Sequence, residues 1–269
     1  MKKTFLSLYI ALSTTFLCHA QITEVSDMHD VFEYFNDADS KTLVIFDVDM
    51  VLIQPSDPAF QMANMKRFSP ICKRALNDVP KDKQMIFLGL ITTSSDPILI
   101  DDRIPQFLNQ IIQKGIPTMA LTANLTGKFG SIDKMEQWRI DKLRQLGIDF
   151  SKSSPCQTPL VFDDLTTYRG NYSTYLNGVL FVNGTTVSKG EAFLSFLEKT
   201  GFYPNKVIFV DDREENLKSV EAAIQKLDKP INFQGLHYLG AQKYPSKVIS
   251  EDEFEFKWQK LALEAKKLD

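Results

Sequence analysis

The chain has 269 residues, with 31 lysines and arginines against 34 aspartates and glutamates, so its formal net charge is −3. No basic run stands out, which excludes an extended nucleic-acid-binding surface of the usual kind. After the first twenty residues, no segment approaches the ~20 apolar residues that a membrane span needs, so we expect no stable membrane span. The length is sufficient for one large domain that carries an insertion.

The first twenty residues have the pattern of a secretory signal peptide. Lys2-Lys3 gives a positive start, residues 5–17 form an apolar stretch, and Cys18-His19-Ala20 resembles a cleavage site. The apolar stretch is shorter than a membrane anchor requires. We therefore expect residues 1–20 to be a signal peptide, residues 21–269 to be the mature chain, and the protein to be periplasmic or secreted.

Apolar runs of strand length then alternate with amphipathic segments of helix length. Five prolines lie between residues 53 and 100, which indicates an insertion after the first strand and not a simple crossover helix. The first half of the chain predicts a helix over about 25–35, a strand over 43–46, helical pieces at 59–68 and 71–76, a helix over 104–114 and a strand over 116–121.

The second half continues the alternation and contains one aromatic segment of different character. Residues 168–183 hold an Asn177-Gly178 pair between β-formers, which is a strong hairpin signal. The remaining predicted elements are a helix over 132–146, strands over 159–162, 207–210 and 232–239, and helices over 190–199, 214–227 and 253–267.

This order predicts an α/β fold with a Rossmann-like parallel sheet and helices on both faces. We expect a core over about 40–53 and 103–245, and a small, mainly helical cap insertion over about 54–102. A β-rich excursion is expected at about 163–187. Cys72 and Cys156 remain after export, either joined in a disulfide that an oxidising compartment permits or as two buried thiols.

Polar side chains follow three of the predicted strands. Asp47 and Asp49 come after the first strand, Thr122 after the second, and Asp211 and Asp212 after the strand over 207–210. The carboxyl ends of parallel strands meet at one edge of such a sheet. Carboxylates from two strands can jointly hold a hard divalent cation, and Mg²⁺ fits best because it binds through few carboxylates together with phosphate oxygens.

Phosphate chemistry is the natural partner of such a metal site. Thr122 supplies a hydroxyl, and Ala123 supplies a nearby backbone amide, for a phosphate oxygen. Lys189 opens a predicted helix, where its ammonium and the helix N-terminus favour an anion. Asp47 can attack phosphorus and form an aspartyl-phosphate. Asp49 shares the face of Asp47 if the backbone stays extended, and can then protonate the leaving alcohol and activate water.

The chain resembles the haloacid dehalogenase superfamily in its phosphatase branch. The four motifs of that family are similar to Asp47-Val48-Asp49-Met50-Val51, to residues 119–122 that end in Thr122, to Ser188-Lys189-Gly190, and to residues 208–212, with Asn216 following. The resemblance covers most of residues 40–240 and leaves the tail unexplained. Val51 replaces the commoner Thr.

The resemblance implies a catalytic set of Asp47, Asp49 and Lys189, with phosphate held by Thr122, Ala123 and Lys189. It also implies a Mg²⁺ site at Asp47, Asp49 (through its backbone carbonyl) and Asp211, supported by Asp212 and Asn216. Within this superfamily, the chain is similar to exported bacterial members of unassigned function.

The sequence therefore predicts an exported magnesium-dependent phosphatase that acts on a small phosphorylated substrate. A phosphotransferase uses the same residues, and an exported binding or effector module with little turnover is the alternative from another class. Asp49 favours catalysis, because a pure binder has no need of it, and it disfavours a dehalogenase, whose reaction releases no alcohol to protonate.

Overall fold

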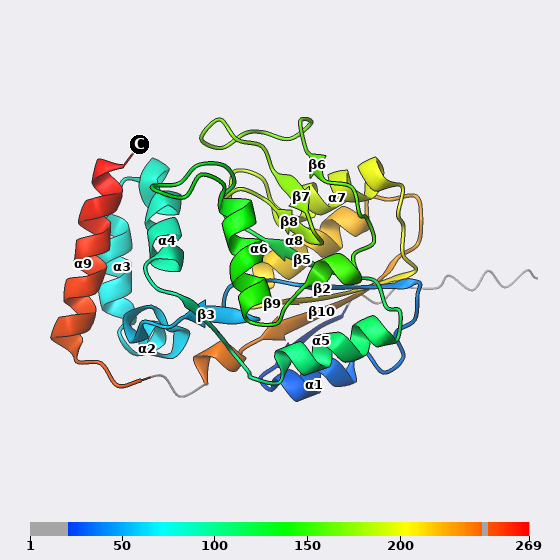
Figure 1. The fold of residues 1–269 in the computed structure, drawn as a ribbon, viewed down its shortest axis with the longest axis horizontal. Helices are drawn as coiled ribbons and strands as arrows, with labels where there is room; N and C mark the ends of the chain where they lie inside the picture. The colour runs from blue at the N-terminus through cyan, green and yellow to red at the C-terminus, as the bar shows by residue number, and fades with distance from the viewer. Residues whose placement is uncertain (1–20, 244–246, 269) are drawn as a thin grey trace, which may run out of the picture.

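The computed structural model describes residues 21–243 and 247–268, and Figure 1 shows them as a layered α/β fold with a helical layer at one end. One eight-stranded sheet forms the centre, in the order β1-β10-β9-β2-β5-β8-β7-β6. The pairs from β1 to β8 are parallel, and β7 and β6 continue the sheet antiparallel. The predicted α/β class with a mostly parallel, Rossmann-like sheet is confirmed. The strands of this sheet are β1 (Gln21–Val25), β2 (Thr42–Phe46), β5 (Thr118–Thr122), β6 (Leu160–Val161), β7 (Thr174–Leu176), β8 (Val179–Phe181), β9 (Lys206–Asp211) and β10 (Asn232–Tyr238).

Helices cover both faces because alternate residues of the central strands point to opposite sides. Val44 and Phe46 of β2 join the apolar cluster under α1, α5 and α6, whereas Leu43 and Ile45 join the cluster under α7 and α8. Figure 1 shows α1 and α5 below the strands and α7 and α8 above them. These helices are α1 (Met28–Glu33), α5 (Ile104–Gln113), α6 (Met135–Gln145), α7 (Lys189–Thr200) and α8 (Glu214–Ile224).

A second layer, which we call the cap, is built from two distant parts of the chain. Its elements are β3 (Ile53–Pro55), α2 (Met62–Arg67), α3 (Ser69–Asp78), α4 (Gln84–Thr93), β4 (Pro97–Leu99) and α9 (Glu251–Lys267). Phe254 and Trp258 of α9 pack with Phe60 and Phe87 in one apolar cluster, and the Trp258 Nε1 donates to the Ala59 carbonyl at 2.8 Å. In Figure 1, α9 lies beside α3 and α4. The tail that the sequence left unexplained is therefore the fourth helix of the cap.

The hairpin predicted at Asn177-Gly178 is confirmed, and it belongs to the central sheet. Both residues have positive φ, 49° and 81°, as a two-residue turn of this kind requires. Its second strand, β8, pairs parallel with β5. The predicted strand over 159–162 is reduced to Leu160–Val161 at the antiparallel edge. Three buried residues in β8 are too short a run for periodicity to identify.

Three further predictions need correction or comment. Residues 21–25 form the edge strand β1 beside β10, and the first helix begins at Met28, not at residue 25. The sequence analysis also missed α4, whose run from residue 84 to 93 is apolar nearly all round. Cys72 and Cys156 are both free thiols, so the disulfide alternative is wrong. Both are half-buried and not fully buried as the other alternative expected. The predicted signal peptide, residues 1–20, lies outside the described residues.

The order of the strands indicates where a ligand is expected. From β2 the chain moves outward to β5 and β8, then returns to the other side of β2 to form β9 and β10. The direction therefore reverses between β2 and β9. In open α/β sheets the crevice at the carboxyl ends of the two strands at such a reversal is the usual ligand site. Within residues 21–243 and 247–268, no helix is long and apolar enough to cross a membrane.

Candidate active site

Three carboxylates meet at the carboxyl ends of β2 and β9. Asp47 follows β2 directly, and its backbone N–H donates to the Val210 carbonyl of β9 at 2.8 Å, so the two strand ends are joined. Asp211 ends β9 with no exposed surface, and Asp47 is 7% exposed. Oxygen atoms of Asp47, Asp211 and Asp212 all lie within 4.8 Å of one another. The sheet topology thus brings together residues that are more than 160 positions apart.

Lys189 enters this group from the first turn of α7. Its Nζ lies 2.8 Å from Asp47 Oδ1 and donates to Asp211 Oδ2 at 2.7 Å. The helix starts here because Ser188 and Glu191 form a capping box, in which each side chain accepts from the other's backbone N–H. The buried ammonium therefore bridges β2 and β9 from a fixed helix end.

Gly190 allows α7 to come close enough to place Lys189. Its backbone N–H donates to Ser219 Oγ of α8 at 3.0 Å. A Cβ at this position would collide with the Ser219 carbonyl, so any larger residue would push the two helices apart. The close packing of α7 against α8 thus explains why a glycine follows Lys189.

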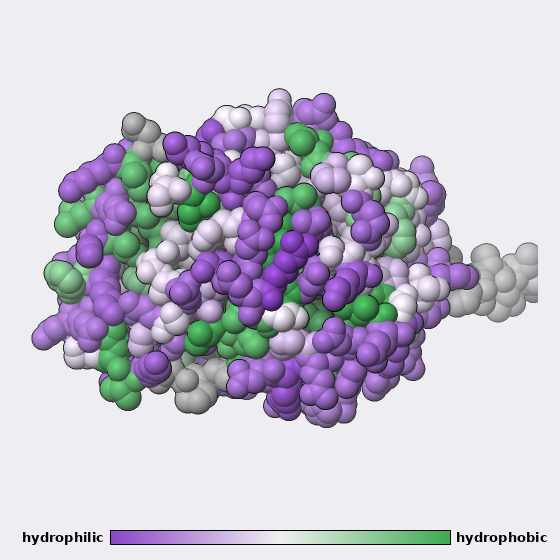
Figure 2. Space-filling model, viewed as in Figure 1, coloured by the Kyte–Doolittle hydropathy of each residue, from purple (hydrophilic) through white to green (hydrophobic). Residues whose placement is uncertain are grey.

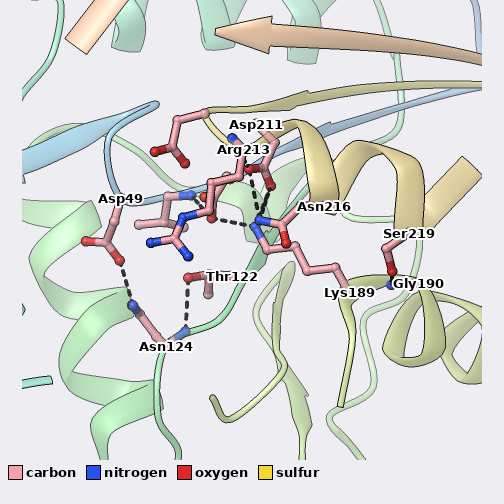
Figure 3. Close-up of polar contacts among 12 residues, drawn as sticks. Asp49, Thr122, Asn124, Lys189, Gly190, Asp211, Arg213, Asn216 and Ser219 are labelled. Atoms are coloured by element: carbon pink, nitrogen blue, oxygen red, sulfur yellow. Dashed lines mark hydrogen bonds and ion pairs between the residues drawn. The ribbon is translucent and has the colours of Figure 1, made fainter. Parts of the chain in front are cut away.

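Asp211 is held in place by two further donors. Asn216 Nδ2 donates to Asp211 Oδ1 at 3.0 Å and to Oδ2 at 3.2 Å, and the backbone N–H of Arg213 donates to Oδ1 at 2.9 Å. Figure 3 shows Asn216 and Lys189 converging on the Asp211 carboxylate. Asn216 therefore fixes the orientation of Asp211, which is the supporting position expected from the sequence.

The group carries more negative than positive charge. With all three carboxyl groups ionised, they and the one buried ammonium sum to −2. Burial raises the pKa of Asp47 well above its ordinary value, although Lys189 opposes the rise. Burial also raises the pKa of Asp212 to about 6, and the negative charge of Asp211 adds to it. For Lys189, burial lowers the pKa, but Asp211 and Asp47 outweigh it and raise the pKa overall.

A divalent cation fits this donor set. Its two positive charges would cancel the excess of −2, and carboxylate oxygens are the ligands that hard cations such as Mg²⁺ prefer. The residues that would hold it are Asp47, Asp211 and Asp212. The sequence predicts the backbone carbonyl of Asp49 as a ligand and Asp212 as support. The Asp212 carboxylate lies within the three-carboxylate group and so joins the ligands, whereas the Asp49 carbonyl stays a prediction.

Asp49 faces another direction because the strand does not continue to it. β2 ends at Phe46, and residues 48–53 form a tight turn in which Met50 has a φ of 64° and its N–H donates to the Ile53 carbonyl at 2.8 Å. Such a φ is uncommon for a residue with a side chain. The expectation that an extended backbone places Asp49 on the face of Asp47 is therefore wrong.

Two core residues hold the Asp49 carboxylate. Asn124 Nδ2 donates to Oδ2 at 2.6 Å, and Arg139 Nη2 lies 3.3 Å from Oδ1. Figure 3 shows Asp49 directed toward Asn124, on the opposite side of the group from Lys189. Arg139 is 1% exposed, and its Nε and Nη2 atoms are buried without a hydrogen-bond partner. Asp49 is therefore the carboxyl group that lies against this buried guanidinium.

Arg139 and Asn124 are site residues that were not predicted from the sequence. A signal for Arg139 existed, because it lies one helical turn from Met135 and Leu143, and both are buried. A charged residue on the buried face of a helix needs a partner. Asn124 stands two residues after the end of β5, close to the expected phosphate position, but its type alone carries little information.

Thr122 and Ala123 lie where β5 ends. The Thr122 side chain is buried, and its Oγ1 accepts from the Asn124 N–H at 3.2 Å, which leaves its own proton for another acceptor. The Ala123 carbonyl accepts from the Gly184 N–H at 2.9 Å and fixes this turn. Because β5 is the direct neighbour of β2, both residues are at the same edge as Asp47.

The chain belongs to the family described as protein of unknown function (DUF2608), whose family model matches residues 24–268. The match runs through both the core and α9. The chain is 26% identical over 248 residues to an uncharacterised protein of Rickettsia bellii, a match that covers 88% of this chain and 84% of the relative. It is 28% identical over 264 residues to an uncharacterised protein of Rickettsia prowazekii, covering 94% and 85%. No solved structure matches the chain significantly.

Proposed function

We propose that this member of the DUF2608 family is an exported, magnesium-dependent phosphatase that hydrolyses a small phosphate monoester. One observation carries the proposal: Asp47, Asp211 and Asp212 meet Lys189 at the strand ends where the sheet reverses direction, with an excess charge of −2. The resemblance to haloacid dehalogenase phosphatases assigns the same residues to this chemistry. Export rests on the pattern of residues 1–20.

Asp47 is the nucleophile. An oxygen of its carboxylate attacks phosphorus, the bond from phosphorus to the alcohol oxygen breaks, and an aspartyl-phosphate forms. A bound Mg²⁺ supplies the positive charge that offsets the repulsion between Asp47 and the phosphate. Lys189 opposes the rise in the Asp47 pKa that burial causes. It also stabilises charge on the transferring group, as the Thr122 hydroxyl and the Ala123 amide do.

Asp49 moves the protons. In the first step its carboxyl group gives a proton to the departing alcohol. In the second step the Asp49 carboxylate takes a proton from water, the water oxygen attacks phosphorus, and the bond to Asp47 breaks. Inorganic phosphate leaves, and both carboxyl groups return to their starting states, so the two steps balance.

Asn124 and Arg139 support Asp49 as positioning residues. The donor at 2.6 Å and the guanidinium at 3.3 Å fix the direction of the carboxylate at the side of the group away from Lys189. This separation suits the two roles, because the nucleophile and the proton donor are then positioned by different groups, Lys189 for Asp47 and Asn124 with Arg139 for Asp49. Arg139 acts through Asp49 and not through contact with phosphate.

The experiment is a phosphatase assay on a panel of phosphorylated sugars, nucleotides and an aryl phosphate, after chelation and after return of Mg²⁺. We expect activity to vanish with the chelator and to return with the metal. Asp163→Asn is the matched control, since Asp163 is an exposed carboxylate paired with Lys199 far from this group. Full activity after exhaustive metal removal refutes the metal assignment. Release of the substrate alcohol without inorganic phosphate, and only when an acceptor alcohol is present to take the phosphoryl group, points to a phosphotransferase.

A further inference from the structure

The outward face of α9 carries large apolar side chains that the cap does not cover. Phe256 is 66% exposed and Leu263 57% exposed, whereas Phe254 and Trp258 on the other face are buried. Seven residues are two helical turns, so Phe256 and Leu263 lie on one line along the helix. Figure 2 shows apolar colour interrupting the polar surface at the left-hand edge, where Figure 1 draws α9.

Charged residues extend this line at both ends. Asp252 lies four residues before Phe256, and Lys267 lies four residues after Leu263, so both share the same face. With Gln259 in the middle, the five side chains form what we call the α9 stripe, and all five are exposed. A hollow of about 410 Å³ runs along it, lined by residues of α9 alone.

The order of residue types along the α9 stripe allows two antiparallel copies of the helix to place complementary side chains opposite each other. Read from one end it is acidic, aromatic, polar, aliphatic and basic. When two copies of α9 run antiparallel about a twofold axis between Gln259 and Lys260, Phe256 meets Leu263 of the second copy. Asp252 then meets Lys267 of the second copy, and each contact occurs twice, as twofold symmetry requires.

We propose that the α9 stripe is the surface through which two copies of this chain associate, with their α9 helices antiparallel. Charge complementarity selects a second copy, because the acidic end of each helix faces the basic end of the other. A parallel pair would set Asp252 against Asp252. A membrane surface prefers a basic rim around apolar residues, whereas the rim of this stripe is mixed, with Asp252 and Glu264 as well as Lys260 and Lys267.

The size of the surface sets the strength of the pair. α9 has 17 residues and is therefore about 25 Å long. A single helix pair of this length is at the low end of the areas that specific interfaces bury, so we expect a dimer that dissociates on dilution. The acidic start and basic end of α9 also suit the helix dipole, but the dipole gives no reason for Phe256 and Leu263 to be exposed.

The test is sedimentation equilibrium of the full chain over a range of concentrations. We expect a reversible monomer–dimer equilibrium, weakened at least about tenfold by Phe256→Glu, which buries a charge at both contacts. Val161→Glu is the matched control, because Val161 is a comparably exposed apolar residue on β6. Leu263→Ser gives a second disruption, and thermal melting checks that each variant folds.

Charge reversal tests the antiparallel register. Asp252→Lys and Lys267→Asp should each weaken the dimer, and the double variant should restore it, because the pair is then reversed and not removed. A monomer at every concentration overturns the proposal. The proposal is also overturned if the double variant forms a dimer no tighter than that of either single variant. It is overturned as well if the wild-type chain binds anionic vesicles but does not self-associate. The result is independent of whether the protein is a phosphatase.

Discussion

The core and the cap of this molecule are assembled in different ways. In the core, the candidate chemical groups follow strands that are neighbours in one sheet, so Asp47 and Asp211 meet because β2 and β9 pair. In the cap, residues 58–93 meet residues 249–268 through a cluster of apolar side chains. In the core, therefore, the pairing of strands fixes where the polar side chains at the strand ends point. The cap instead depends on apolar packing between two segments that are far apart in the chain.

The difference predicts separate effects of substitution. Each polar contact of the candidate active site described above joins residues of the core. The cap is held mainly by apolar packing, with the Lys257–Asp57 pair at 2.9 Å among its polar contacts. Substitutions in the candidate active site should therefore lower the turnover rate with little loss of stability. Substitutions in the apolar cluster of the cap should lower stability with little change in the turnover rate.

The largest effect is expected for Asp47→Asn. An amide is a poor nucleophile, so kcat should fall on the order of 10⁶-fold, as nucleophile removal does elsewhere. Thermal stability should not fall, because the change removes one of the excess buried negative charges. Steady-state assays and thermal melting measure the two effects. Wild-type turnover in this variant contradicts the catalytic assignment, and gross unfolding contradicts the separation of core from cap.

Asp49→Asn should have the next largest effect, about 10²–10⁴-fold on an alkyl phosphate. The loss should shrink on an aryl phosphate, whose leaving group needs less protonation. Arg139→Gln should follow the same pattern with a smaller loss than Asp49→Asn, because it acts through Asp49. Arg139→Lys keeps the charge but not the planar fork, and should lie between Arg139→Gln and wild type.

Combining the two substitutions distinguishes positioning from general damage. Adding Arg139→Gln to Asp49→Asn should cost little further activity, since residues that act as one unit are not additive. Arg144→Gln is the control on the same helix, because Arg144 pairs at 3.7 Å with Asp149 at a partly exposed position. Equal losses on alkyl and aryl substrates, or full additivity, count against the positioning role.

The cap should respond in stability. Trp258→Ala removes a buried ring and its hydrogen bond to Ala59, and should lower the free energy of unfolding by about 3–5 kcal/mol. Phe256→Ala on the exposed face of the same helix should change it by less than about 0.5 kcal/mol at concentrations where the chain is monomeric. Urea unfolding measures both. Turnover of an aryl phosphate by folded Trp258→Ala should stay near wild type, and its loss would show that the cap takes part in the chemistry.

Site residues that directly follow a strand could be predicted from the sequence. Residues whose position depends on a local turn or on a contact with a distant segment could not. Asp47, Thr122 and Asp211 follow apolar runs that are visible in the sequence, and Lys189 follows a helix cap. Asp49 lies in a turn that begins at Val48, whose carbonyl accepts from the Leu52 and Ile53 N–H groups, and no pattern of residues announced that the strand would end at Phe46.

Distant contacts explain the other failures. The pairing of Asp49 with Arg139 and the packing of α9 on α4 join residues far apart in the chain, and periodicity is silent on such contacts. Periodicity showed that residues 253–267 form a helix, but not which layer the helix would cover. Only the fold of the whole chain supplies that information.

The most direct test of the account is to look for phosphate on Asp47. Asp49→Asn keeps the nucleophile but lacks the base that hydrolyses the aspartyl-phosphate. After incubation with an aryl phosphate and Mg²⁺ and a rapid acid quench, intact-protein mass spectrometry should show one added phosphoryl group, mapped by peptide analysis to residue 47. The Asp47→Asn/Asp49→Asn variant should show none. Turnover of the aryl phosphate without any phosphorylated protein, or with phosphate on a residue other than Asp47, would contradict the account.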